Sequence, residues 1–172
     1  GATPDIVAVS KTLGGGIPLA ATVTSRDIEE ACFQKGFFFY TSHMNEPLPS
    51  AVGLAVIDAI LEEKLVEAAR EKGEYLKNGL LALKDRHEVI GDVRGRGLLL
   101  GVDFVKDRAS RKPAETEAER ISQVALRRGL FMSPIRQRGR YFVWRVAPPM
   151  TITYGEIDRA LQIIDDSIAE VC

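Results

Sequence analysis

The chain has 172 residues, of which 45% are hydrophobic and 27% charged, and its formal net charge is −1. This composition is typical of a globular protein with one ordinary domain or two small ones, and the balanced charge gives no basis for binding nucleic acid or an anionic membrane. Two cysteines are too few for a disulfide scaffold, and no apolar run approaches the ~20 residues that span a bilayer, so we expect a cytoplasmic protein.

The first sixty residues are predicted to form two strands, a short helix, a loop and a long helix. Apolar, β-branched runs at residues 6–10 and 19–24 are typical of strands. Ser25 is a candidate N-cap for a short helix, because acidic residues follow it in the first turn. Pro47 suits the first turn of a long helix that repeats an apolar residue at every fourth position. The aromatic segment 36–42 lacks helical spacing and is interpreted as an extended loop.

From residue 65 the pattern predicts another long helix and then a small α+β domain. We expect helices at residues 65–85, at 114–128 and from 153 onward, and strands at 89–93, 98–105 and 141–146. Thr153 and Glu156 have the spacing of a capping box, and Gly129 is expected to end the middle helix. Residues 62–64 form the expected bend between the two parts.

Lys11 is the most informative single residue, because it follows an apolar run read as a buried strand and precedes the glycines at 14–16. A lysine amine can condense with an aldehyde cofactor, and glycine lets a ligand approach the backbone closely. On position alone, a solvated charge beside an ordinary turn explains the same residues more simply, so both interpretations stay open.

Arg145 interrupts the apolar strand at 141–147, where an unpaired charge is costly to bury. Strict alternation places it on the face of Val143 and Ala147. An arginine fork matches a carboxylate through two parallel hydrogen bonds, so Arg145 is a candidate substrate clamp. An internal salt bridge to an aspartate or glutamate is the equal alternative.

Other motifs favour no function. The glycines at 91–101 lead into a strand and not into a helix, which excludes a dinucleotide-binding fingerprint. The two cysteines and two histidines lack the close pairs that a structural zinc site needs. The basic cluster Arg136, Arg138 and Arg140 is interpreted as the solvated edge of a hairpin and not as a phosphate site.

Four segments together resemble the C-terminal half of the fold-type-I, pyridoxal-phosphate-dependent class III aminotransferases. They are residues 4–18, 40–49, 91–97 and 145–149. The resemblance implies an α/β fold in which residues 1–62 are the C-terminal part of the large cofactor-binding domain, with the end of its sheet and a long helix. Residues 63–172 would be the small C-terminal α+β domain, and the N-terminal half would be absent.

The resemblance also implies roles for single residues. Lys11 would bind pyridoxal 5′-phosphate covalently and later carry a proton for the substrate. Ser42, where the family usually has threonine, would donate to the cofactor phosphate of a neighbouring subunit, and Arg145 would bind the substrate α-carboxylate. Amino acids and 2-oxo acids would be the substrates. A homodimer or larger homo-oligomer is expected, with the aromatic segment 37–40 at its interface.

Within the class, residues 40–54 and 91–108 resemble the 2,2-dialkylglycine decarboxylases most. This implies decarboxylation-dependent transamination with pyruvate as amino acceptor, with an ordinary ω-amino acid:2-oxo acid aminotransferase as the alternative. It also implies an alkali-metal site (K or Na) at Ser42, at the Met44 carbonyl and at Glu46, which is one methylene longer than the family's aspartate. The chain alone is not expected to be a competent enzyme, and a non-catalytic domain is the remaining alternative.

Overall fold

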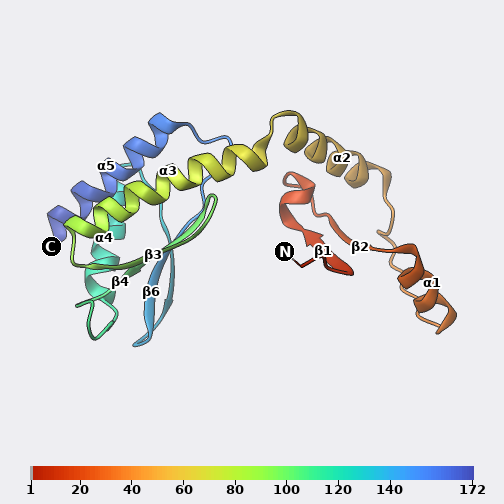
Figure 1. Ribbon diagram of the computed structural model, residues 1–172, viewed down its shortest axis with the longest axis horizontal. Helices are drawn as coiled ribbons and strands as arrows, with labels where there is room; N and C mark the ends of the chain where they lie inside the picture. The colour runs from red at the N-terminus through yellow and green to blue at the C-terminus, as the bar shows by residue number, and fades with distance from the viewer. Residues whose placement is uncertain (1) are drawn as a thin grey trace. The chain divides into compact units, whose positions relative to one another are not determined.

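The computed structural model describes residues 2–172, which divide into two compact units, Gly1–Lys64 and Leu65–Cys172. Each unit has its own helices and strands (Figure 1). The division falls two residues after the domain boundary expected between residues 62 and 63. Within residues 2–172 no helix is long and apolar enough to cross a membrane.

The first unit contains one antiparallel strand pair and two helices. β1 (Ile6–Ser10) pairs with β2 (Ala20–Thr24), and a short 3₁₀ helix, η1 (Lys11–Gly14), begins the connection between them. α1 (Arg26–Gln34) and α2 (Pro47–Glu62) follow. The Ile28 backbone N–H donates to the Ser25 hydroxyl at 3.4 Å, which confirms Ser25 as the N-cap of α1. The predicted elements of this unit are thus all present.

The burial expected in this unit is not observed. β1 has only exposed and half-buried residues, and every residue of β2 is exposed. The prediction of a buried strand before Lys11 is therefore wrong for this chain, because β1 pairs only with β2. In α2 the sole buried residue is Gly53, although the helix is rich in leucine, isoleucine and valine.

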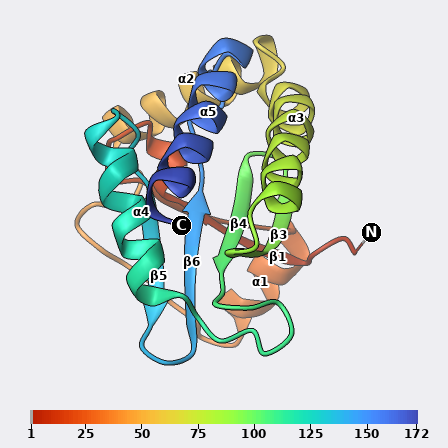
Figure 2. The same ribbon diagram turned by 90° about the vertical axis from the view of Figure 1, so that its left-hand side faces the viewer.

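The second unit is a four-stranded antiparallel sheet covered on one face by three helices. The strand order is β3 (Ile90–Arg96), β4 (Leu99–Phe104), β6 (Tyr141–Val146) and β5 (Ser133–Gln137). The helices are α3 (Leu65–Arg86), α4 (Glu115–Arg127) and α5 (Tyr154–Val171), which lie together in front of the sheet in Figure 2. The expected α+β arrangement is observed, with β5 as an additional, unpredicted strand.

The core of the second unit is centred on β6. Phe142, Trp144 and Val146 alternate with half-buried or exposed residues and face the helices. The Trp144 ring contacts Phe104 edge-on, with ring centroids 4.6 Å apart. Its indole N–H donates to the Ser122 hydroxyl of α4 at 2.7 Å, so the one polar atom of this buried ring is satisfied.

The helices bury the faces that their periodicity predicts. The buried positions at helical spacing are Leu76, Leu80 and Leu83 in α3, Ala118, Ile121 and Ala125 in α4, and Ile157, Ile164 and Ile168 in α5. Both hydrogen bonds of the Thr153–Glu156 capping box are present. Gly129 has φ 93, and the Leu130 N–H donates to the Ala125 carbonyl at 2.8 Å, which confirms where α4 ends.

Gly73 sets how closely α3 approaches the β3–β4 turn. A Cβ at Gly73 would collide with the backbone of Gly97, which cannot move like a side chain. We expect Gly73→Ala to destabilise the second unit by about 1–3 kcal/mol through overpacking. Gly155→Ala is the matched control, since no atom lies within 4 Å of a Cβ added at this helical glycine. This variant should be more stable than wild type, by up to about 1 kcal/mol in the free energy of unfolding, because alanine favours the helix more than glycine does.

Urea unfolding of the chain, followed by the fluorescence of its single tryptophan, Trp144, measures both changes. Equal stability of the two variants would contradict the close approach at Gly73.

Candidate active site

Lys11 is held in an unusual backbone conformation. It is the first residue of η1 and has φ 56, in the left-handed region that side chains other than glycine rarely adopt. Its side chain is exposed, and within residues 2–172 its amine makes no hydrogen bond or ion pair. Lys64 shares this conformation, with φ 51, so the strain alone does not mark a site.

The backbone after Lys11 leaves space for a ligand. Gly15 and Gly16 have φ 55 and φ 108, and a Cβ built on Gly16 would meet no atom within 4 Å. An exposed, unpaired amine beside this open, glycine-lined backbone fits a cofactor that carries an aldehyde.

The loop before α2 contains the residues expected to bind phosphate or metal. Ser42 is exposed, and no partner of its hydroxyl lies within residues 2–172, so the hydroxyl is free to donate to a phosphate. The His43 Nδ1 lies 2.6 Å from a Glu46 carboxylate oxygen. Glu46 is therefore already engaged by an imidazole, and a metal at Ser42, Met44 and Glu46 would have to displace this contact. In the described part of the chain no group of three His, Cys, Asp or Glu side chains could hold a metal ion.

Arg145 lies on the face of the sheet opposite to Trp144, away from the helices. Its cross-strand neighbours are Gly101 on β4 and Ser133 on β5. One guanidinium nitrogen is 3.5 Å from the Ser133 hydroxyl. The internal salt bridge left open by the sequence is not formed, because no carboxylate within residues 2–172 pairs with Arg145. The guanidinium is thus available to an external anion.

A second arginine on the same face is fully engaged. Arg94 donates to both oxygens of Asp103, at 2.6 and 2.9 Å, and to Asp92 at 3.0 Å. The hydrogen bond that Arg94 donates to Asp103 has the largest effect and raises the pKa of the Arg94 guanidinium above its usual value. Partial burial opposes this rise, and the hydrogen bond to Asp92 adds to it. Sequence reasoning did not single out this cluster, although Asp92 and Arg94, two residues apart in a strand, share one face.

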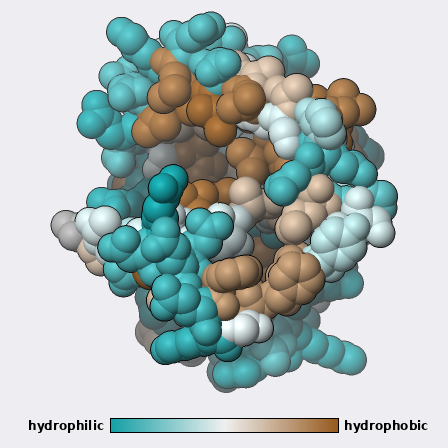
Figure 3. All heavy atoms as spheres, turned by 90° about the vertical axis from the view of Figure 1, so that its right-hand side faces the viewer, coloured by the Kyte–Doolittle hydropathy of each residue, from teal (hydrophilic) through white to brown (hydrophobic). Residues whose placement is uncertain are grey.

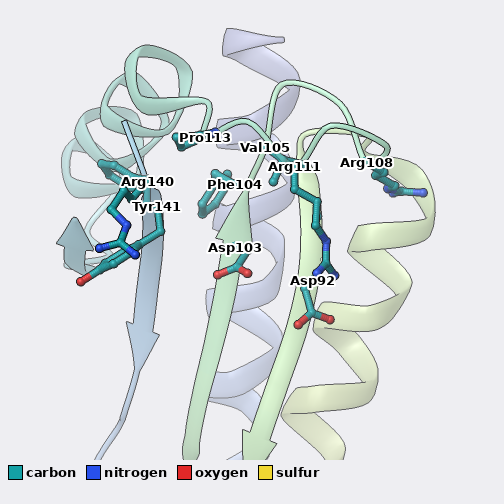
Figure 4. A pocket seen from close by; sticks show the side chains of 11 residues that line it. Asp92, Asp103, Phe104, Val105, Arg108, Arg111, Pro113, Arg140 and Tyr141 are labelled. Atoms are coloured by element: carbon teal, nitrogen blue, oxygen red, sulfur yellow. The ribbon is translucent and has the colours of Figure 1, made fainter. Parts of the chain in front are cut away.

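A hollow of about 200 Å³ lies beside Asp92 and Asp103. Figure 4 shows the two carboxylates on neighbouring strands, with Arg111 above them and Arg140 and Tyr141 to one side. The basic cluster lies at a hairpin, as predicted. Arg136 is in β5 and pairs with Glu119, and Arg140 is the last residue of the turn that leads into β6.

The chain matches the family described as Aminotransferase class-III over residues 1–168. It is 42% identical over 168 residues to an uncharacterized aminotransferase of Schizosaccharomyces pombe, covering 98% of this chain and 38% of that protein. It is 37% identical over 171 residues to a leucine/methionine racemase of Thermococcus litoralis, covering 99% of this chain and 37% of the relative.

A solved structure agrees with these relatives. An amine transaminase from an uncultivated Pseudomonas species, crystallised in its PLP-bound form, matches with a TM-score of 0.86 at 29% identity and covers 98% of this chain and 39% of its own. The chain belongs to the class III aminotransferase family, and its fold is that of the PLP-dependent transaminases. It spans less than two fifths of the length of these curated relatives.

Proposed function

We propose that this chain is part of a pyridoxal-phosphate-dependent class III aminotransferase in which Lys11 holds the cofactor. The observation that carries the proposal is the unpaired Lys11 amine close to the open backbone of Gly16, in a chain of this family. When bound, the cofactor supplies an electron sink that stabilises negative charge at the substrate Cα. Residues 1–62 would belong to the large cofactor-binding domain and residues 63–172 to the small domain.

Each candidate residue has a distinct task in this proposal. Lys11 would hold the cofactor through its aldehyde, and its amine would move a proton at the substrate Cα. Ser42 donates its hydroxyl hydrogen to the cofactor phosphate. Arg145 binds and orients the substrate α-carboxylate through its planar fork. The substrates would be an amino acid and a 2-oxo acid.

Lys11→Ala in the full-length protein should abolish covalent cofactor binding at the site, because it removes the amine that bonds to the aldehyde. Reduction with borohydride followed by mass spectrometry measures the cofactor fixed to the protein. Lys64→Ala is the matched control, since Lys64 is exposed and has the same left-handed backbone. Covalent labelling that persists in Lys11→Ala, or that is lost in Lys64→Ala, would contradict the assignment.

Decarboxylation-dependent transamination is the second candidate reaction. It is supported by the resemblance of residues 40–54 and 91–108 to the 2,2-dialkylglycine decarboxylases, and it carries with it the alkali-metal site at Ser42, Met44 and Glu46. The contact between His43 and Glu46 weighs against the metal, because the carboxylate already has a partner.

If this second candidate holds, the full-length protein should release carbon dioxide from 2-aminoisobutyrate in the presence of pyruvate. The rate of carbon dioxide release is compared in potassium, sodium and choline buffers. If the alkali-metal site is present, release should be faster in potassium or in sodium buffer than in choline buffer. Alanine formation from another amino donor without carbon dioxide from 2-aminoisobutyrate would leave the ordinary ω-aminotransferase as the function.

A homodimer or larger homo-oligomer is part of the proposal. The segment 37–40 exposes Phe37, Phe38, Phe39 and Tyr40, and Figure 3 shows several apolar side chains at the surface on this side of the chain. α2 also exposes Leu48, Leu54 and Leu61. Exposed apolar clusters of this kind mark contact surfaces, and we assign part of this one to a second subunit.

Sedimentation of the full-length protein at micromolar concentration should therefore give at least a dimer. Phe38→Asp, at the most exposed aromatic of the segment, should shift the equilibrium toward monomer, whereas Phe131→Asp in the second unit serves as the control at similar exposure. A monomeric wild-type protein would refute the shared interface.

A further inference from the structure

Ser133 lies directly beside Arg145 on the open face of the sheet, the face that α3, α4 and α5 do not cover. The register between β5 and β6 pairs the two residues, and β4 contributes Gly101 on the other side of Arg145. A glycine has no side chain, so the guanidinium has its adjacent partner on β5, where the Ser133 hydroxyl lies 3.5 Å away. The next pair of β5 and β6 on this face, Ile135 and Val143, is apolar. The hydroxyl is thus the polar group next to Arg145 on the β5 side.

The neighbours of Ser133 in the chain hold its backbone in place. Met132, which precedes it, is buried in the core of the second unit. Pro134 follows it, and a residue before proline is restricted to extended backbone. The proline ring also fixes its own φ. The serine is therefore anchored on both sides, although β5 is the edge strand of the sheet.

The Ser133 hydroxyl has a hydrogen that is not yet used. A guanidinium can only donate, so the hydroxyl oxygen accepts the hydrogen bond from Arg145, whereas a hydroxyl can accept and donate at the same time. Within residues 2–172 the Ser133 hydroxyl hydrogen has no acceptor, and Arg145 pairs with no carboxylate. Two adjacent groups on one face thus offer unused N–H and O–H donors, and one external carboxylate, with two acceptor oxygens, satisfies both.

We propose that Ser133 is a substrate-binding residue that forms the α-carboxylate site together with Arg145. The inference rests on the proposed function, in which Arg145 binds this carboxylate. The hydroxyl accepts a hydrogen bond from the guanidinium, which limits the rotation of the arginine side chain, and donates its own hydrogen to a carboxylate oxygen. The amino acid and the 2-oxo acid both carry this carboxylate away from the reacting bonds. Loss of the hydroxyl should therefore weaken substrate binding and leave the chemical step unchanged.

The first test is the KM of full-length Ser133→Ala holoenzyme, for an amino donor and for whichever of pyruvate and 2-oxoglutarate the wild type uses better. Both KM values should rise by about tenfold, the effect of one lost hydrogen bond to a charged group, while kcat stays at the wild-type value. Ser133→Thr keeps the hydroxyl and should keep the wild-type KM. Ser110→Ala is the matched control, because Ser110 is exposed in the same unit and its hydroxyl binds Asp107 instead.

A second test separates contact with the carboxylate from a general change of the site. The bound cofactor aldehyde reacts with aminooxyacetate, which carries a carboxylate, and with O-methylhydroxylamine, which does not. Absorbance of the cofactor follows both reactions without any turnover. Ser133→Ala should slow the reaction with aminooxyacetate by about tenfold and leave the reaction with O-methylhydroxylamine unchanged.

Three outcomes would overturn the inference. They are an unchanged KM in Ser133→Ala, a KM in Ser133→Thr that rises as much as in Ser133→Ala, and equal slowing of the two reagents. If Ser133→Ala does not fold, Ser133→Thr and Ser133→Val decide, since they have the same shape with and without the hydroxyl. Absence of transamination with every 2-oxo acid would refute the proposed function itself, whereas transamination with an unchanged KM in Ser133→Ala refutes the inference alone.

Discussion

The burial of one face of the four-stranded sheet decides where the charged groups of the second unit lie. α3, α4 and α5 cover the face that carries Phe142 and Trp144, and the two-residue period of a strand then forces Arg145 to the other side. An arginine in this apolar strand is consequently tolerated without an internal carboxylate. The same alternation places Arg94 and Asp103 on that open face. The sheet therefore has one face covered by helices and one face that carries these charged side chains.

The first unit differs from the second, because almost none of its residues are buried. Gly14 and Gly53 are its buried residues within 2–64, while α2 is apolar around most of its circumference. A helix of this kind is stable when other elements surround it. The strained backbone at Lys11 likewise needs surrounding structure to hold it in place. Within residues 2–64, side chains of the unit itself leave both features largely exposed.

Much of the fold follows from the sequence, because the helices of the second unit bury amphipathic faces and have clear ends. Leu76, Leu80 and Leu83 repeat at helical spacing, and Thr153 and Glu156 cap α5 as predicted. β5 was not predicted because it is an edge strand with Pro134, Arg136 and a single apolar residue, a composition that periodicity does not distinguish from a turn. The exposure of β1 was missed because an apolar run indicates burial without saying which partner provides it.

Part of the candidate site could likewise be predicted from the sequence, and part could not. Lys11 and Arg145 were predicted as candidates because each is a charged residue next to or within an apolar run, a pattern that local sequence reveals. The engagement of Arg94 depends on the register between β3 and β4, and an irregularity between Ile90 and Asp92 shifts that register at the point where the strand begins. It brings Asp92 opposite Asp103, and Arg94 opposite Gly101. Two aspartates facing each other across a strand pair would repel, and the Arg94 guanidinium offsets this repulsion by pairing with both of them.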